Sequence, residues 1–393
     1  MKKVLVVLLA LCLSVSLFAQ GGKEVAAPKA QDAYAIAMIT DYGDITDQSF
    51  NQTTYEACKA YAEASNLKFK YFKPSGDSTE ARVAMVEQAV DEGFNIVVMP
   101  GFAFAETVVK AAPQYKDVKF VALDVALGDI LAAAVGSSYN YNPADYNVAD
   151  YIDLSNVYCI VYQEEIAGFL AGYATVALGY DNLGFCGGMA VPAVIRYGYG
   201  FVQGADAAAA KLGRKVNVQY TYANQFFGDA DITAAMDAMY ANGAQVVFAC
   251  GGGVFTSVAE AAVKVNGKLV GVDVDQKALI DATYNAPLTV TSAMKGLYSS
   301  TQATLKLIIE DNKWNTVAGT FGNLGLISGT DVEANYVGIP LVGTEWSDSF
   351  TKQDYTNLVN DIFTGKIKVN NNTEISPAQN AKTITVKDLG NIK

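Results

Sequence analysis

The fold follows from one stretch of sequence, Asp41-Tyr42-Gly43-Asp44-Ile45-Thr46-Asp47-Gln48-Ser49-Phe50-Asn51. An apolar run at 35–40 precedes it and a helical pattern from about residue 52 follows it, so we predict a turn between a buried strand and a helix. Ligands bind beyond the carboxyl ends of strands in open α/β sheets. We therefore interpret the stretch as a ligand-binding loop. In it, Phe50 would stack on a flat group while Asp41 and Asn51 hydrogen-bond to its edges. The simpler alternative is an acidic surface turn with Phe50 packed locally.

Composition restricts the function. The chain has 393 residues, 51% of them hydrophobic and 17% charged, which is typical of a globular protein large enough for two domains. Its formal net charge of -12 disfavours a nucleic-acid partner. The chain has no histidine, the commonest general base and metal ligand, so the composition argues against an enzyme. We predict no cofactor and no metal.

The first residues resemble an export signal. Residues 1–19 combine two lysines with a short apolar run and are predicted to be a signal peptide, and residues 20–32 a polar tether. Cys12 stands in a weak lipobox, because Leu11 is bulky where a small residue is expected. We expect an exported protein, either periplasmic or lipid-anchored on the outer side of the cytoplasmic membrane.

Four cysteines remain after the predicted cleavage: Cys58, Cys159, Cys186 and Cys250. None belongs to a C-x-x-C pair, which leaves zinc and redox motifs without support. The last three lie in apolar segments and are predicted to be small buried residues. Export permits a disulfide, but this spacing does not require one.

An internal repeat predicts the architecture. Each copy has a strand, a helix, a strand that begins after a glycine, a second helix, and a strand that ends in aspartate. Gly93 and Asp124 occupy these positions in the first copy, and Gly243 and Asp273 in the second. Alternating strands and helices form right-handed parallel βαβ units. We therefore predict an α/β protein with two similar, doubly wound lobes joined by a hinge and facing each other across a cleft.

The repeat also suggests domain boundaries. The N-terminal lobe is expected to span 33–156, with a contribution from about 296–315. The C-terminal lobe is expected to span 157–295, with a contribution from about 316–393, whose polar end beyond residue 369 we expect to be loosely held. The tyrosine-rich segment at 136–153 is interpreted as a surface insertion, either a packed loop or a partner-binding surface.

Further candidates lie at predicted strand ends. Asp124 and Asp273 could cap helices, but their matched positions favour ligand contacts. Phe226 is expected to lie opposite Phe50, although Phe227 adjoins it. Lys295 follows a β-rich run and could be solvent-exposed, or it could pair with Asp273 and hold a hydroxyl group. Two glutamates at 164 and 165 are interpreted as favourable charges at a helix N-terminus.

Taken together, these features resemble the basic membrane protein family over residues 33–368. These are nucleoside-binding lipoproteins, substrate-binding components of ABC importers with a type I periplasmic-binding-protein fold. Three motifs carry the resemblance: Asp41-x-Gly43-x-x-x-Asp47-x-Ser49-Phe50-Asn51, Gly271-Val272-Asp273-x-Asp275-Gln276 and Thr291-Ser292-x-x-Lys295. Three features depart from it: Tyr42 where a small residue is usual, the poor lipobox, and the tyrosine-rich insertion.

The resemblance implies a purine nucleoside (guanosine, inosine or adenosine) held between the lobes and delivered by a monomer to an ABC transporter permease. Phe50 and Phe226 would sandwich the base. The base edges or nearby groups would meet Asp41, Asn51 and Asp124. The ribose hydroxyls would meet Asp273 and Lys295, and Gly251 would allow close backbone approach.

Other functions remain open. A sugar or autoinducer receptor of the same fold is the nearest alternative, although a pyranose site usually has more amides and arginines. A nucleoside hydrolase could use the aspartates of 41–47 as acid, base or metal ligands. A surface protein that contacts host or matrix components through the tyrosine-rich insertion is the third alternative.

Overall fold

The computed structural model describes residues 34–41 and 43–393. The predicted signal peptide, the tether, Cys12 and Tyr42 lie outside the described residues. Tyr34–Lys393 forms one compact unit. None of the described helices is long and apolar enough to cross a bilayer.

The first half of the chain builds one parallel sheet. Its strands are β1 (Ala35–Ile39), β2 (Lys68–Phe72), β3 (Ile96–Pro100), β4 (Lys119–Leu123), β5 (Val157–Tyr162) and β11 (Thr320–Leu324). Their spatial order is β11-β5-β4-β3-β1-β2. All residues of β1 and β3 are buried, as expected for parallel strands covered by helices on both faces.

The second sheet repeats this plan. Its strands are β6 (Asn182–Gly187), β7 (Asn217–Tyr222), β8 (Val246–Cys250), β9 (Lys268–Asp273), β10 (Thr289–Lys295), β12 (Val337–Gly338) and β13 (Thr385–Asn391). Their order is β12-β10-β9-β8-β6-β7-β13, and only β12 is antiparallel to its neighbour. The orders β2-β1-β3-β4-β5 and β7-β6-β8-β9-β10 are the same doubly wound pattern, which confirms the predicted fold class.

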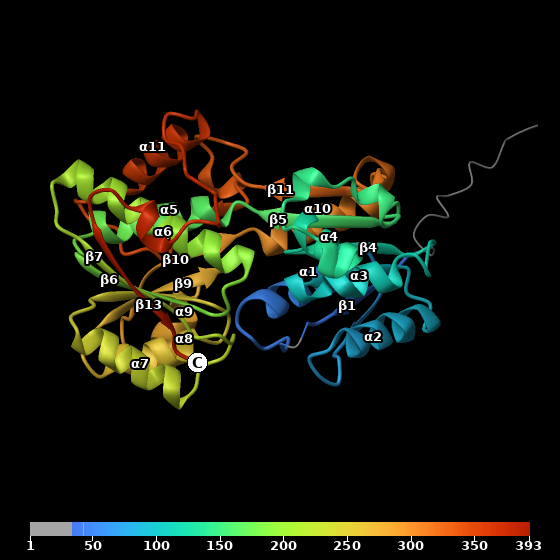
Figure 1. Ribbon diagram of the computed structural model, residues 1–393, viewed down its shortest axis with the longest axis horizontal. Helices are drawn as coiled ribbons and strands as arrows, with labels where there is room; N and C mark the ends of the chain where they lie inside the picture. Colours follow the sequence, from blue (N-terminus) through green and yellow to red (C-terminus); the bar gives the residue numbers. More distant parts are fainter. Residues whose placement is uncertain (1–33, 42) are drawn as a thin grey trace, which may run out of the picture. The chain divides into compact units, whose positions relative to one another are not determined.

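The helices connect successive strands (Figure 1). They are α1 (Phe50–Ala64), α2 (Thr79–Asp91), α3 (Ala105–Ala111), α4 (Leu127–Val135), α5 (Glu164–Ala177), α6 (Pro192–Leu212), α7 (Ala230–Ala241), α8 (Phe255–Val263), α9 (Lys277–Tyr284), α10 (Leu297–Ile309) and α11 (Lys352–Phe363). The matched glycines Gly93 and Gly243 both have positive φ, 84° and 96°, where glycine carries no Cβ penalty.

The structure differs from the predicted lobe boundaries in the strands that flank the crossings. We expected Val157 to begin the second lobe, but β5 pairs with β4 in the first sheet. β11, assigned to the second lobe, pairs with β5. β5 is the fifth strand of the doubly wound order in the first sheet. Its apolar sequence predicts a buried strand but does not indicate which of two similar sheets the strand joins. As predicted, α10 contacts α1 of the first lobe. The chain thus changes sheets after β5, after β10 and after β11.

The C-terminal end is also more ordered than predicted. We expected the polar segment beyond residue 369 to be loosely held, but β13 runs parallel to β7 at the edge of the second sheet. Most of its side chains are exposed. An edge strand can be held by main-chain hydrogen bonds without an apolar side-chain pattern, and this explains why the sequence did not indicate it.

Helices α5 and α6 approach each other at backbone distance. Every residue of α5 is buried. A Cβ at Gly168 would lie 2.1 Å from the carbonyl oxygen of Tyr197, and one at Gly200 would lie 2.1 Å from the carbonyl oxygen of Glu165. Both positions therefore require glycine, and the two helices are held together through main-chain contact.

The tyrosine-rich insertion is a packed loop of short 3-10 turns. The Tyr139 ring is buried and its centroid lies 5.3 Å from that of Tyr141 and 5.1 Å from that of Tyr146. Tyr141, by contrast, is 82% exposed. Cys58, Cys159, Cys186 and Cys250 are buried and free, which confirms the prediction that the last three are small buried residues.

Candidate ligand-binding site

A cavity of about 350 Å³ lies at the carboxyl ends of strands from both sheets. Its volume falls within the usual range for small-molecule sites. Loops after β1 and β3 contribute to it from the first sheet, and the loop after β8 from the second, so it opens at the switch points where ligands of doubly wound proteins bind. All eight predicted site residues line it: Asp41, Phe50, Asn51, Asp124, Phe226, Gly251, Asp273 and Lys295. Their contact with a ligand stays a prediction.

The loop at 41–51 combines a ligand-facing side and a helix cap. The Asp47 carboxylate accepts hydrogen bonds from the backbone amides of Ser49, Asn51 and Gln52, and so caps the start of α1. Asp41 Oδ1 accepts from the Gly43 amide at 2.6 Å and from Asn51 Nδ2 at 3.1 Å. Burial raises the pKa of Asp41 to about 6. The stretch is thus a capped turn that also lines the cavity, and its binding of a ligand stays a prediction.

Phe50 begins α1 and is half-buried at the cavity wall. Its ring centroid lies 4.5 Å from Lys295 Nζ, a cation–π contact that fixes the ring beside the charged end of the cavity. The half-buried ring thus lines the cavity and also packs against the hydrophobic core, as the simpler interpretation expected.

The two matched aspartates end their strands in the same unusual conformation. Asp124 has φ 58° and Asp273 has φ 64°, in the left-handed region that few non-glycine residues adopt. Such strain is found mainly at functional sites. Both side chains reach Lys295, whose Nζ lies 2.5 Å from Asp124 Oδ2 and 3.6 Å from Asp273 Oδ1.

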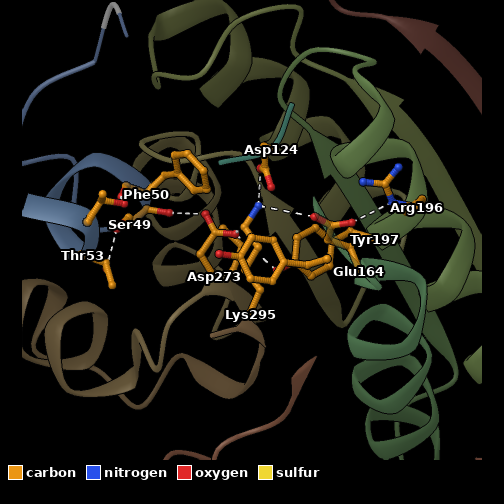
Figure 2. A network of polar contacts seen from close by, with 12 residues as sticks. Ser49, Phe50, Thr53, Asp124, Glu164, Arg196, Tyr197, Asp273 and Lys295 are labelled. Carbon is orange, nitrogen blue, oxygen red and sulfur yellow. Dashed lines mark hydrogen bonds and ion pairs between the residues drawn. The ribbon is translucent and has the colours of Figure 1, made fainter. Parts of the chain in front are cut away.

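Lys295 is the centre of a buried ionic network, which we call the Lys295 cluster: Lys295, Asp124, Glu164 and Asp273 (Figure 2). The lysine side chain is 3% exposed. Burial favours its neutral form, but the carboxylates of Asp124, Asp273 and Glu164 outweigh burial and raise the pKa of Lys295. The ammonium group therefore stays charged inside the protein.

The two lobes meet directly beside this cluster. Ser49, from the loop after β1, donates a hydrogen bond of 2.6 Å to Asp273 Oδ2. Gln276 Nε2 donates to the carbonyl oxygen of Gln48 at 3.1 Å. Asp273 also accepts from the Tyr197 hydroxyl at 3.3 Å. One oxygen of Asp124, Oδ1, is buried and has no hydrogen-bond partner among the described residues.

Sequence reasoning missed Glu164 as a member of the site. We interpreted it only as a charge at a helix N-terminus, and it does begin α5. It is also fully buried, accepts a hydrogen bond of 2.7 Å from Arg196 Nε and lies 3.6 Å from Lys295 Nζ. The available signal was the pair of acidic residues that opens an otherwise apolar helix, because such charges are rarely buried without partners.

The second aromatic wall comes from the loop after β7. Phe226 is half-buried and lines the cavity, as predicted, and Phe227 also lines it but is 61% exposed. A Cβ at Gly251 would lie 2.8 Å from the Gly188 backbone and 3.3 Å from the Phe226 ring. Gly251 therefore permits close packing of the protein itself beside the cavity, in addition to any approach of a ligand.

Two α/β lobes with a cavity at their strand ends are the arrangement of the type I periplasmic-binding-protein fold. Solved structures of solute-binding proteins share this fold. A solute-binding protein from Conexibacter woesei has a TM-score of 0.62 at 20% identity, over 86% of this chain and 99% of that one. One from Aeropyrum pernix has a TM-score of 0.60 at 19% identity, over 85% and 87%.

The chain belongs to the Bmp family, described as PnrA-like ABC transporter substrate-binding proteins, whose model matches residues 35–373. The ABC transporter nucleoside-binding protein BmpA of Lactococcus lactis is 27% identical over 62% of this chain and 64% of its own length. A lipoprotein of Pyrococcus horikoshii is 24% identical over 61% and 55%. The chain thus spans less than two thirds of these two relatives. Basic membrane protein D of Borreliella burgdorferi is 26% identical over 78% and 82%.

Proposed function

We propose that this protein binds a purine nucleoside in the cavity and delivers it to the permease of an ABC importer. The observation that carries the proposal is that aromatic and charged side chains line the same cavity. Phe50 and Phe226 offer ring faces to a base, while Asp124, Asp273 and Lys295 offer acceptors and a donor to a sugar.

The electrostatics support a neutral ligand with several hydrogen-bond donors. Five aspartates and two lysines line the cavity: Asp41, Asp44, Asp47, Asp124, Asp273, Lys73 and Lys295. Excess carboxylates accept from hydroxyl and amino groups and repel anions. The buried Oδ1 of Asp124 accepts no hydrogen bond from the described residues, and such an acceptor typically costs about 1–3 kcal/mol, so this carboxylate is where an added donor would have the most to contribute.

Export and anchoring complete the proposal. Relatives include proteins named as lipoproteins, and the predicted signal peptide at residues 1–19 would send this chain across the membrane. The receptor would be either anchored to the outer side of the cytoplasmic membrane by a lipid on Cys12 or free to diffuse in a periplasm. In both cases it would present its loaded and closed form to the permease.

Calorimetry tests the proposal. Purified protein is titrated with guanosine, inosine, adenosine, uridine and ribose, after native mass spectrometry has checked for retained ligand. A purine nucleoside should bind most tightly and should be recovered intact. Preference for ribose would favour the sugar-receptor alternative. Conversion of inosine to base and ribose would favour the hydrolase. Absence of binding by all five would refute the proposal.

A Phe50→Ala variant tests the stacking wall. Loss of a stacked ring should weaken nucleoside binding by about 1–3 kcal/mol and leave ribose binding unchanged. Phe363→Ala is the matched control, because Phe363 lies on α11, is 48% exposed and does not line the cavity. Equal nucleoside affinity in both variants would remove Phe50 from the site.

A further inference from the structure

Two members of the Lys295 cluster stand where the chain changes sheets. Glu164 begins α5, directly after β5 leaves the first sheet, and α5 packs against β10 of the second sheet. Lys295 is the last residue of β10, and α10, which follows it, packs against α1 of the first lobe. The contact between Lys295 and Glu164 therefore joins two of the three crossing segments.

Glu164 lies behind the cavity wall. It is fully buried and does not line the cavity, whereas Lys295 does. One of its oxygens, Oε2, accepts from Arg196 Nε at 2.7 Å. The other, Oε1, accepts no hydrogen bond from the described part of the chain and lies 3.6 Å from Lys295 Nζ, close enough for an ion pair. Arg196 thus holds one side of the carboxylate, and the other side faces the lysine (Figure 2).

The ammonium group of Lys295 is held between opposing attractions. Asp124 attracts it from the first sheet at 2.5 Å, and Asp273 and Glu164 attract it from the second sheet and α5 at 3.6 Å each. Three rings surround it, with centroids 4.5 Å, 5.5 Å and 5.7 Å from Nζ for Phe50, Tyr162 and Tyr197. Without the charge of Glu164, the ammonium group of Lys295 would be drawn toward the carboxylate of Asp124, which is the nearer one.

We propose that Glu164, fixed by Arg196, is a positioning residue that sets where Lys295 presents its ammonium group to a sugar hydroxyl. This inference rests on the proposed function. It makes recognition of the sugar depend on a residue that the ligand does not touch. The base, held by the aromatic walls, would be unaffected by Glu164.

The test compares a nucleoside with its free base. In Glu164→Gln, which keeps the shape but removes the charge, inosine affinity should fall about tenfold or more, because the ammonium group of Lys295 loses the attraction of Glu164 and moves away from the proposed sugar contact. Hypoxanthine affinity should stay within about twofold. The matched control is Asp181→Asn, which removes a similar carboxylate from Arg214 Nε at 2.7 Å, away from the cavity.

The outcomes separate the two proposals. A wild-type protein that binds no purine nucleoside would refute the proposed function. A wild type that binds inosine, with Glu164→Gln unchanged or with both ligands weakened in parallel, would overturn the positioning role alone. If Glu164→Gln does not fold, Arg196→Gln takes its place and should lower the inosine-to-hypoxanthine affinity ratio by a smaller factor; an unchanged ratio would again overturn the role.

Discussion

The ends of β4 and β9 are the same position in two copies of one fold, yet they are used differently. Asp124 and Asp273 share a left-handed backbone and both reach Lys295. Asp273 is also engaged by Ser49 and Tyr197 within the protein. Among the described residues, the Asp124 side chain accepts a hydrogen bond from Lys295 alone, and its second oxygen is unpartnered.

This difference shows how a repeat acquires distinct roles. The fold supplies two equivalent carboxylates, and their surroundings decide which is structural and which is available. Asp273 ties the loop that precedes α1 to the second sheet. Asp124 has an oxygen that accepts no hydrogen bond from the described residues, and we propose that the ligand binds on this side. Three experiments can break or sharpen this contrast.

Removing the shared lysine should have the largest effect. Lys295→Met leaves Asp124 and Asp273 buried without their cation and leaves Glu164 paired with Arg196 alone, and breaking a buried ion pair in this way typically costs about 3–5 kcal/mol. We expect a large fall in the free energy of unfolding, measured by urea titration, together with loss of nucleoside binding. A variant as stable as the wild type would mean that the cluster contributes little to folding.

Neutralising each aspartate alone should separate the two roles. Asp124→Asn should weaken ligand binding by about 1–3 kcal/mol and should cost less stability than Asp273→Asn, because among the described residues the Asp124 carboxylate accepts a hydrogen bond from Lys295 alone. Asp273→Asn should lower both, since it also disturbs Ser49 and Tyr197. Paired calorimetry and urea unfolding provide the measurements. Equal stability losses in the two variants would erase the contrast.

The smallest effect concerns pH and Asp41. Burial raises the pKa of Asp41 to about 6, so the folded protein retains a proton that the unfolded chain has already released at pH 5. Raising the pH through about 4–6 therefore removes stability contributed by this group. A ligand that donates to the carboxylate favours its charged form, so affinity should rise toward pH 6, by at most about tenfold per pH unit, and then level off.

The matching control for the pH experiment is Asp41→Asn. Burial likewise raises the pKa of Asp124 to about 6 and that of Glu165 to about 7, so the wild-type profile contains more than one titration. The part that belongs to Asp41 is the difference between the profiles of the two proteins. Superimposable profiles would show that Asp41 does not titrate on binding.

Much of the site could be predicted from the sequence, because strand ends are local features. A parallel sheet brings the residues that follow its strands to one edge, so Asp41, Asp124 and Asp273 could be assigned to that edge from their positions alone. The cavity contains all three. Their roles toward a ligand are still predictions.

The rest depended on contacts between distant segments. The charge of Glu164 is explained locally by the start of α5, so nothing in its own surroundings indicated Arg196 or Lys295 as partners. In the same way, the choice of sheet for β5 depends on which sheet has a free edge strand. β13 is held by main-chain hydrogen bonds, which leave no apolar pattern in the sequence. Such features belong to the assembled chain.

The main-chain contact between α5 and α6 has a consequence for engineering this protein. Glu164 and Arg196 stand on these two helices, and their spacing is set by the absence of a methyl group at Gly168 and Gly200. One added carbon at either glycine would wedge the helices apart and draw the guanidinium away from the carboxylate. Specificity could therefore be altered by a change made on the side of the helices that no solute ever reaches.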